Sequence, residues 1–328
     1  HDARGNVCFN CAGEILYPAA RRVVVMNLES RTQRVFSGHV DRVSCLAVRQ
    51  DGVVAASGES GARAAVFVWD TLTLETLARI ILPSPPPGPL ADPGVACLAF
   101  GAEGNALVTV GEDNNVTVWD LRSKQMTARG SAGKGRVLAV KTNRFEKKGL
   151  KIVTAGTMAV KFWSSNFGTR GTQIGEEPLV GVHGSVGEEG TSQCAVCIES
   201  VTKNTTVTGM QDGSVYVWNG TTLVRSIEMA HTGPVMDMVS SDNFLYSGGK
   251  DGKMHKWSLS ARKFPDDDPK AQRTLTQLVA SVEADEMCKQ TDAAYEAKAA
   301  TTFAKPGDTS LPGASPSKRS MSPRSPKR

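Results

Sequence analysis

Apolar and polar residues alternate with a period of two along several short segments of the chain. Two clear cases are NVTVW at 115–119 and SVYVW at 214–218. This alternation is typical of strands that bury one face. The turn signal Asp212-Gly213 comes directly before the second segment. The pattern therefore predicts strands joined by tight turns, and an all-β chain.

Five tryptophans close five similar phrases, and their spacing indicates a repeat. Successive tryptophans are 50, 44, 55 and 39 residues apart, which brackets the period of roughly 40 to 45 residues of WD40 propeller blades. The two long intervals hold a Pro-rich stretch at 83–93 and a Gly-rich stretch at 168–190. Loops between blades absorb such insertions at little cost.

A further unit without a terminal tryptophan lies at the front of the chain. It consists of four short apolar segments, VCFN, EILYPAA, RVVVMNL and QRVF. With this unit, six blade-like repeats run from Val7 to about Phe264. We therefore predict a WD40 β-propeller of six recognisable blades over residues 1–264, with a seven-bladed ring that lacks one blade as the alternative.

A polar pattern recurs in register with the tryptophans. In three units a small hydroxyl residue is followed four places on by an aspartate, and six places later by the tryptophan. Histidines in SGH and AHTG stand upstream, where a blade keeps the histidine that completes a buried network of indole, hydroxyl, imidazole and carboxylate. The residues assigned to these structural networks are His39, Ser57, Trp69, Thr109, Asp113, Trp119, Trp163, Thr208, Asp212, Trp218, His231, Ser247, Asp251 and Trp257.

Two units depart from this pattern. The Trp163 unit, TAGTMAVKFW, is one residue short and has no aspartate. The Trp69 unit carries an enlarged turn, ESGARAA, without the usual aspartate. These two units therefore match the repeat less closely than the others.

Three of the network residues could also be read as a catalytic triad, namely His231, Ser247 and Asp251. A triad does not recur in register along a chain, whereas a blade network does. No other set of residues has the spacing of an active site. We therefore expect no catalytic residues, no cofactor and no enzyme activity.

Two CxxC pairs, Cys8/Cys11 and Cys194/Cys197, could indicate a zinc site. Alignment of the repeats instead places Cys45, Cys97 and Cys197 at one equivalent strand position, where a small buried side chain is wanted. Residues three apart on a strand also point to opposite faces. We therefore expect no metal.

The segment GSAGKGR around Lys134 is similar to a phosphate-binding loop. It lacks the full GxxxxGK[ST] spacing and a following helix, and it lies between two blades. We interpret it as a connecting loop.

The front of the chain resembles the EMAP-like family, the echinoderm microtubule-associated-protein-like WD-repeat proteins. The resemblance is carried by HDARGNV, VVVMNLES, QRVFSGHVDRVSCLAV, AASGES and VFVWDTLTLETL, and it continues through GPVMDMVSSDNFLYSGGKDGKMHKWS. It covers about four fifths of the chain. It implies the family's first propeller, for which seven blades and a second, fused propeller are expected, whereas six units are seen here. It also implies tubulin or microtubules as partners.

The pattern changes after residue 264. Asp268 is a plausible N-cap, Pro269 suits the first helical position, and Leu275, Leu278, Val279 and Val282 have helical spacing. This predicts a helical extension over 265–304, with the helix itself from about Pro269 to Phe303. The composition of residues 305–328 predicts a disordered basic tail.

The charge is unevenly distributed between this tail and the rest of the chain. The chain holds 38 basic and 33 acidic residues, and the last fourteen residues contain five basic residues and no acidic one. Since the remainder is balanced, we do not expect nucleic acid as a partner. No apolar run approaches the roughly 20 residues that cross a bilayer. With scattered cysteines that fit a reducing compartment, we expect no membrane association and a location in the cytoplasm and cytoskeleton.

Three Ser-Pro pairs, at Ser315, Ser322 and Ser325, make the tail a candidate for phosphorylation. Each phosphate adds about −1.5 to −2 charges, so three would cancel the positive charge. Our hypothesis is that the unmodified tail adheres to an acidic polymer such as tubulin's acidic tails, and the alternative is a solvated terminus without function. The candidate contacts are Lys318, Arg319, Arg324, Lys327 and Arg328.

The leading functional hypothesis is a non-enzymatic, microtubule-associated WD40 scaffold, in which the link to tubulin comes from the resemblance. Propeller loops suit the docking of other proteins, and Arg42, Gln50 and Arg136 are candidates there. The alternative is a generic WD40 adaptor in a signalling or RNA-associated complex.

Overall fold

The computed structural model describes residues 5–61, 64–83, 94–147, 149–167, 177–241, 243–261 and 273–283. These residues fall in a compact unit that spans His1–Ala284. They form six sheets in chain order, antiparallel except for one short parallel edge strand, and each sheet is one blade. The WD40 β-propeller predicted from the repeat is therefore confirmed. No helix in the described residues is long and apolar enough to cross a membrane.

Each blade consists of a consecutive stretch of strands. Blade 1 holds β1 (Cys8–Phe9), β2 (Ile15–Ala19), β3 (Arg22–Met26) and β4 (Gln33–Phe36). Blade 2 holds β5 (Val43–Val48), β6 (Val54–Glu59), β7 (Ala65–Asp70) and β8 (Thr76–Ile81). Blade 3 holds β9 (Val95–Phe100), β10 (Ala106–Gly111), β11 (Asn115–Asp120) and β12 (Gln125–Ser131).

The remaining blades follow the same order. Blade 4 holds β13 (Val137–Thr142), β14 (Leu150–Gly156), β15 (Val160–Ser165) and β17 (Gly181–His183). Blade 5 holds β18 (Ala195–Ser200), β19 (Thr205–Met210), β20 (Val215–Asn219) and β21 (Thr222–Ile227). Blade 6 holds β22 (Val235–Ser241), β23 (Phe244–Gly249), β24 (Lys253–Ala261) and β25 (Arg273–Glu283).

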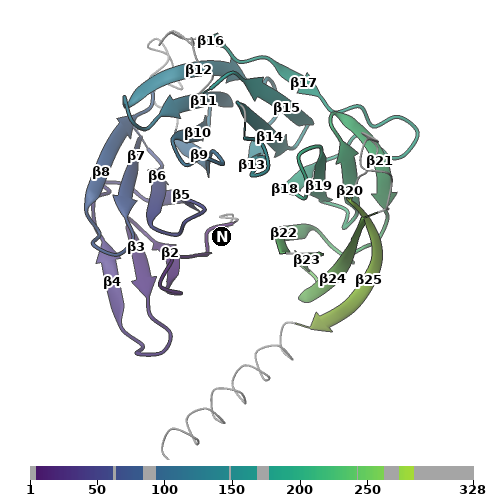
Figure 1. The fold of residues 1–328 in the computed structure, drawn as a ribbon, viewed down its shortest axis with the longest axis horizontal. Coiled ribbons are helices and arrows are strands. Elements are labelled where there is room, and N and C mark those ends of the chain that lie inside the picture. Colours follow the sequence, from purple (N-terminus) through teal and green to yellow (C-terminus); the bar gives the residue numbers. More distant parts are fainter. Residues whose placement is uncertain are drawn as a thin grey trace, which may run out of the picture. The chain divides into compact units, whose positions relative to one another are not determined.

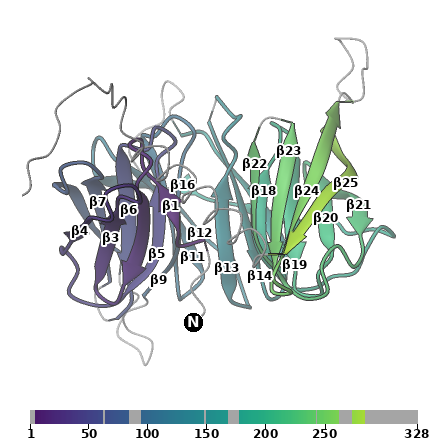
Figure 2. The ribbon, with the colours of Figure 1, turned by 90° about the horizontal axis from the view of Figure 1, so that it is seen from below.

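The blades stand side by side around a common centre, and the innermost strands of blades 2 to 6 are β5, β9, β13, β18 and β22 (Figure 1). Innermost strands of successive blades contact one another, from β5 and β9 to β18 and β22. Seen from below, the sheets stand upright beside one another (Figure 2). In Figure 1, blade 1 and blade 6 lie at the two ends of the arc.

The hydrophobic core is divided into five clusters, and each cluster lies between two neighbouring blades. Middle strands such as β6, β10 and β19 are buried along their whole length because a blade covers each face. Every tryptophan lies in the cluster between its own blade and the preceding blade. These residues are Trp69, Trp119, Trp163, Trp218 and Trp257.

Blade 1 has no tryptophan, and a methionine takes its place. The Oδ1 atoms of Asn27 and Asp70 each accept the backbone N–H groups two and three residues further on, so the two residues cap equivalent turns. Met26 therefore stands where Trp69 stands in blade 2. No preceding blade is present among the described residues for a tryptophan at this position to pack against.

The Gly-rich stretch at 168–190 adds strands to the outer edges of the blades. Its described part contains β17 of blade 4 and a short strand, β16 (Glu177–Pro178), which pairs in parallel with β12 of blade 3. Ser185 then makes a bridge to Thr222 of blade 5. This stretch was expected to be a simple loop, but it links the outer edges of three blades.

The helix predicted from about Pro269 is wrong over residues 273–283, which form β25. This strand pairs antiparallel with β24 along its length, from Lys253↔Glu283 to Ala261↔Arg273. The same segment is rich in threonine and valine, which favour strands, and without it the edge of β24 would present unpaired backbone groups. Blade 6 therefore extends past the predicted boundary at residue 264. The rest of the predicted extension, 284–304, and the tail at 305–328 lie outside the described residues.

Candidate functional site

All five tryptophans donate a hydrogen bond from the indole Nε1 to a buried hydroxyl. The distance is 3.0 Å for Trp69–Ser57, Trp119–Thr109 and Trp163–Thr154, and 2.9 Å for Trp218–Thr208 and Trp257–Ser247. The sequence pattern missed Thr154, because this residue lies nine positions before its tryptophan and not ten. The shorter hairpin of blade 4 explains the shift.

In blade 6 the predicted network is complete. The Nε2 atom of His231 lies 2.8 Å from Ser247 Oγ, and its Nδ1 lies 3.1 Å from Asp251 Oδ1. Because Ser247 receives the indole proton, its own hydrogen is free to bond Nε2, and the imidazole then donates from Nδ1 to the carboxylate. Every polar atom of this buried chain is thereby satisfied.

Blade 2 contains the same network with a glutamate in place of the aspartate. His39 Nε2 lies 2.6 Å from Ser57 Oγ, and His39 Nδ1 lies 3.1 Å from Glu59 Oε2. Burial lowers the pKa of His39, although the Glu59 carboxylate acts in the opposite direction. Sequence reasoning missed Glu59 because it follows the serine by two positions and not four.

In blades 3 and 5 no hydrogen bond leads from the threonine to the aspartate, so the predicted chain to an aspartate is wrong there; in blade 5 the Thr208 hydroxyl donates to Met210 Sδ. Asp113 caps its own turn by accepting the N–H of Asn115, and Asp212 does the same for Ser214. The two aspartates therefore stabilise the hairpin that follows the hydroxyl residue. Within the described part of these blades, no histidine joins them to the threonine.

His255 is a second buried histidine in blade 6 that the sequence pattern did not indicate. Its ring stacks on His231 with centroids 4.2 Å apart and planes 13° apart. Burial, together with the neighbouring His231, lowers the pKa of His255. Its Nδ1 is buried without a hydrogen-bond partner among the described residues.

The cysteines occupy the strand positions that the repeat indicates. Cys45, Cys97 and Cys197 pair with Gly58, Val110 and Gly209, which are equivalent positions on the second strands of their blades. Burial raises the pKa of the Cys45 thiol far above its ordinary value. In the described ranges, no group of three or more His, Cys, Asp or Glu is placed to hold a metal ion.

A polar belt joins the inner strands of blades 4, 5 and 6. Lys141 Nζ on β13 lies 3.2 Å from Glu199 Oε2 on β18. The other oxygen of this carboxylate accepts from Ser240 Oγ on β22 at 2.7 Å. Arg144 also donates to Ser240, at 2.9 Å. Because each group has its partner within the propeller, these contacts hold neighbouring blades together.

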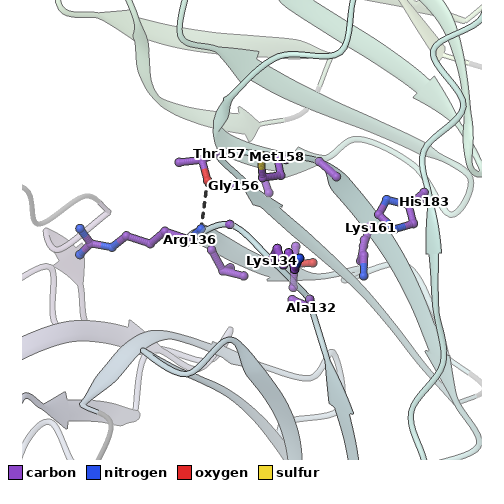
Figure 3. Close-up of a pocket in the computed structure, with 14 residues that line it drawn as sticks. Ala132, Lys134, Arg136, Gly156, Thr157, Met158, Lys161 and His183 are labelled. Atoms are coloured by element: carbon purple, nitrogen blue, oxygen red, sulfur yellow. Dashed lines mark hydrogen bonds between the residues drawn. The ribbon is translucent and has the colours of Figure 1, made fainter. Parts of the chain in front are cut away.

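A cationic pocket lies in blade 4, and we call it the blade-4 pocket. It has a volume of about 260 Å³ and is formed by the loop between β12 and β13 and the hairpin between β14 and β15 (Figure 3). Lys134, Lys161 and His183 line it, and no carboxylate does. The loop is the GSAGKGR segment, in which Gly133 and Gly135 have φ values of 84° and 94°.

Strand register explains why this pocket exists. Thr154 pairs with Lys161, and Lys161 pairs with His183, so the three side chains share one face of blade 4. We call such a line of paired residues across the strands of a blade a row. In the equivalent row, blade 2 has Phe67 opposite Ser57, and blade 6 has His255 opposite Ser247.

Those two rings pack on a network histidine. The centroids of Phe67 and His39 are 4.6 Å apart, and those of His255 and His231 are 4.2 Å apart. Blade 4 has a lysine where these rings stand, and the lining of its pocket contains no imidazole next to the threonine. The space that a network fills in the other two blades is therefore open.

Comparison with known proteins is in line with this architecture. A family model described as the echinoderm microtubule-associated protein first beta-propeller matches residues 32–295. Human echinoderm microtubule-associated protein-like 4 is 30% identical, over 78% of this chain and 27% of that protein. Human echinoderm microtubule-associated protein-like 1 is 27% identical, over 80% of this chain and 32% of that protein. The chain thus spans less than a third of the length of these relatives.

Solved structures at low sequence identity are similar to this chain in fold only. The structure of U3-55K has a TM-score of 0.62 at 18% sequence identity and covers 86% of this chain and 83% of its own. The computationally designed Ika8 protein has a TM-score of 0.56 at 23% identity, over 79% of this chain and 72% of its own. Because the family model matches most of the chain, this protein belongs to the echinoderm microtubule-associated protein family and contains that family's first β-propeller.

Proposed function

We propose that the protein is a non-enzymatic scaffold that binds microtubules or tubulin and is located at the cytoskeleton. The match of the family's first-propeller model to residues 32–295 carries this proposal. The relatives are named as microtubule-associated proteins. The chain contributes a propeller, a fold that presents loops to protein partners.

The burial of the polar networks supports a binding role over catalysis. Ser57 and Ser247 are 0% and 1% exposed, and each already receives an indole proton. A substrate would have to displace a tryptophan to reach either hydroxyl. The serine–histidine–carboxylate sets therefore serve to hold their blades together, as the recurrence in the sequence indicates.

Cosedimentation with polymerised tubulin across a salt series tests the proposal. The wild-type chain is compared with a variant in which the five basic tail residues, Lys318, Arg319, Arg324, Lys327 and Arg328, are changed to Gln. We expect both to pellet with microtubules at physiological salt, the variant with lower affinity and a weaker dependence on salt. Failure of the wild-type chain to pellet at any salt concentration contradicts the proposal.

The same two proteins, wild type and the five-residue variant, also distinguish microtubule binding from the alternative function, an adaptor in a signalling or RNA-associated complex. RNA binding by the tail would disappear in the five-residue variant and fall steeply with salt. Microtubule binding that survives in this variant assigns recognition to the remainder of the chain. RNA binding in the absence of any microtubule binding would favour the adaptor.

A further inference from the structure

We propose that the blade-4 pocket binds a phosphoryl group carried on a partner peptide. This goes beyond microtubule association and does not depend on it. The proposal rests on the origin of the pocket, on the charge of its lining and on the donors that remain available there.

The two lysines in the lining of the pocket carry positive charge that no carboxylate balances. Lys134 and Lys161 form no ion pair with a carboxylate among the described residues, and Lys161 Nζ lies 5.7 Å from the centroid of the Trp163 ring. Other lysines of this blade behave differently, since Lys141 and Lys151 each lie within 3.3 Å of a glutamate oxygen. Two lysines without carboxylate partners attract an anion, and the imidazole of His183 adds a polar group to the same lining.

Neutral donors face the same space. Thr154 is 3% exposed and accepts the indole proton of Trp163. In blades 2 and 6 the equivalent hydroxyl bonds a histidine Nε2, but no imidazole stands next to Thr154. Its hydrogen is therefore available to an oxyanion in the pocket.

The glycine loop permits close approach to Lys161. A Cβ atom on Gly133 would lie 3.5 Å from Lys161 Nζ, and one on Gly135 would lie 2.2 Å from Met158 Cγ. The contact at Gly133 is an ordinary one, whereas a side chain at Gly135 would clash with Met158, and both positions have a positive φ that favours glycine. Figure 3 shows the Arg136 side chain pointing away from Lys161 and His183, so this arginine stands at the rim, where it can contact residues that flank the anion.

The shape and charge of the pocket favour a phosphopeptide. A phosphoryl dianion offers three acceptor oxygens and pairs well with several cations and a hydroxyl, whereas a single carboxylate carries half that charge. Sites that bind single-stranded nucleic acid commonly add aromatic rings on which the bases stack. The pocket has no Phe, Tyr or Trp in its lining.

The test is a titration of the full chain with O-phosphoserine, followed by the amide NMR signals of Gly133, Lys134 and Gly135. We expect saturable shifts, and binding weaker by about tenfold or more in Lys161→Gln and in Lys134→Gln, because each removes one charge-assisted hydrogen bond. Arg79→Gln is the matched control. Arg79 occupies in blade 2 the row position of His183, and its replacement is expected to leave binding unchanged.

Several outcomes would overturn the proposal. One is the absence of saturable shifts in wild type, and another is unchanged affinity in both lysine variants at an unchanged thermal midpoint. Glutamate that binds as tightly as phosphoserine would assign the pocket to carboxylates. Single-stranded RNA that competes at lower concentration than phosphoserine would assign it to nucleic acid.

Discussion

Glu59 Oε2 lies 3.1 Å from the Nδ1 atom of His39, in the place that Asp251 takes beside His231. The glutamate also accepts backbone N–H groups from Val40, Asp41 and Ala65. One carboxylate thus accepts from four donors in and just before blade 2. Glu59 follows Ser57 by two positions, whereas Asp251 follows Ser247 by four. The longer side chain of the glutamate compensates for this difference.

Glu59→Ala is expected to destabilise the protein strongly. The change leaves the imidazole and three backbone donors without their acceptor, at a cost of about 3 kcal/mol. Urea unfolding followed by tryptophan fluorescence measures the loss. The exposed Glu75→Ala is the control and is expected to change stability by less than about 0.5 kcal/mol. Equal stability of the two variants would show that Glu59 is not part of the network.

Ser247→Ala should cost more stability than Thr154→Val. Ser247 serves both the Trp257 indole and His231, whereas Thr154 serves only the Trp163 indole among the network groups. We expect a difference of about 1 to 2 kcal/mol, which is the cost of one additional unsatisfied buried group. The measurement is the unfolding free energy of both variants under the same conditions. A larger loss in Thr154→Val would contradict the proposed chain of hydrogen bonds.

Stability is expected to fall as the pH decreases below about 6.5, the ordinary pKa of histidine. The pKa values of His39 and His255 are lowered in the folded protein. In this pH range the unfolded chain therefore binds more protons than the folded chain, and protonation favours unfolding. The stability that these two histidines contribute is fully present above about pH 6.5. It is lost as the pH falls toward their lowered pKa values in the folded protein.

A variant isolates one of these two histidines. His255→Phe places in blade 6 the residue type that Phe67 supplies at the same row of blade 2. We expect this variant to lose less stability between pH 7.5 and 5.5 than wild type, as measured by thermal midpoints. His183→Gln, at an exposed position, is the control and should follow the wild-type curve. An identical pH dependence in all three proteins would refute the role of His255.

The strand assigned to residues 273–283 can be tested by shortening the chain. A version that ends at residue 272 leaves β24 without its outer partner, whereas one that ends at 284 keeps it. We expect the shorter version to unfold at lower urea concentration and to aggregate, because an open edge strand pairs with other chains. Equal behaviour of the two versions would argue against the strand.

The repeat made the blades predictable, because tryptophan spacing and alternating patterns report directly on strands that are buried on both faces. Glu59 and Thr154 were missed for a simpler reason, since each lies outside the fixed register of the pattern. Residues 273–283 have apolar residues at helical spacing and also contain threonine and valine, which favour strands. The choice of a strand over a helix depends on the edge of β24, with which this segment pairs.

The blade-4 pocket depends on a pairing that is distant in sequence. Lys161 and His183 become neighbours because β17 crosses from the Gly-rich stretch to pair with β15. No local sequence motif predicts this contact. The glycine-rich loop around Lys134 could be recognised in the sequence. That it borders a pocket follows only from the structure, in which blade 4 has no network histidine and has Lys161 where blades 2 and 6 have Phe67 and His255.

Three serines of the tail offer a further prediction on microtubule binding. Glu at Ser315, Ser322 and Ser325 should weaken pelleting with microtubules, because the added negative charge offsets the basic residues nearby. The triple Ala variant is the control and should bind like wild type. Both are compared in cosedimentation at low and physiological salt. Unchanged binding by the Glu variant would leave the tail without a role in charge-dependent attachment.

Hydrogen exchange of the tryptophan indole protons tests most directly whether the recurring polar residues hold the blades together. We predict that all five Nε1 protons are strongly protected at neutral pH, because each bonds a buried hydroxyl between two blades. Ser247→Ala should speed the exchange of Trp257 while Trp69 stays protected. Rapid exchange at any of the five indoles in wild type, or equal effects of Ser247→Ala on Trp69 and Trp257, would contradict this account.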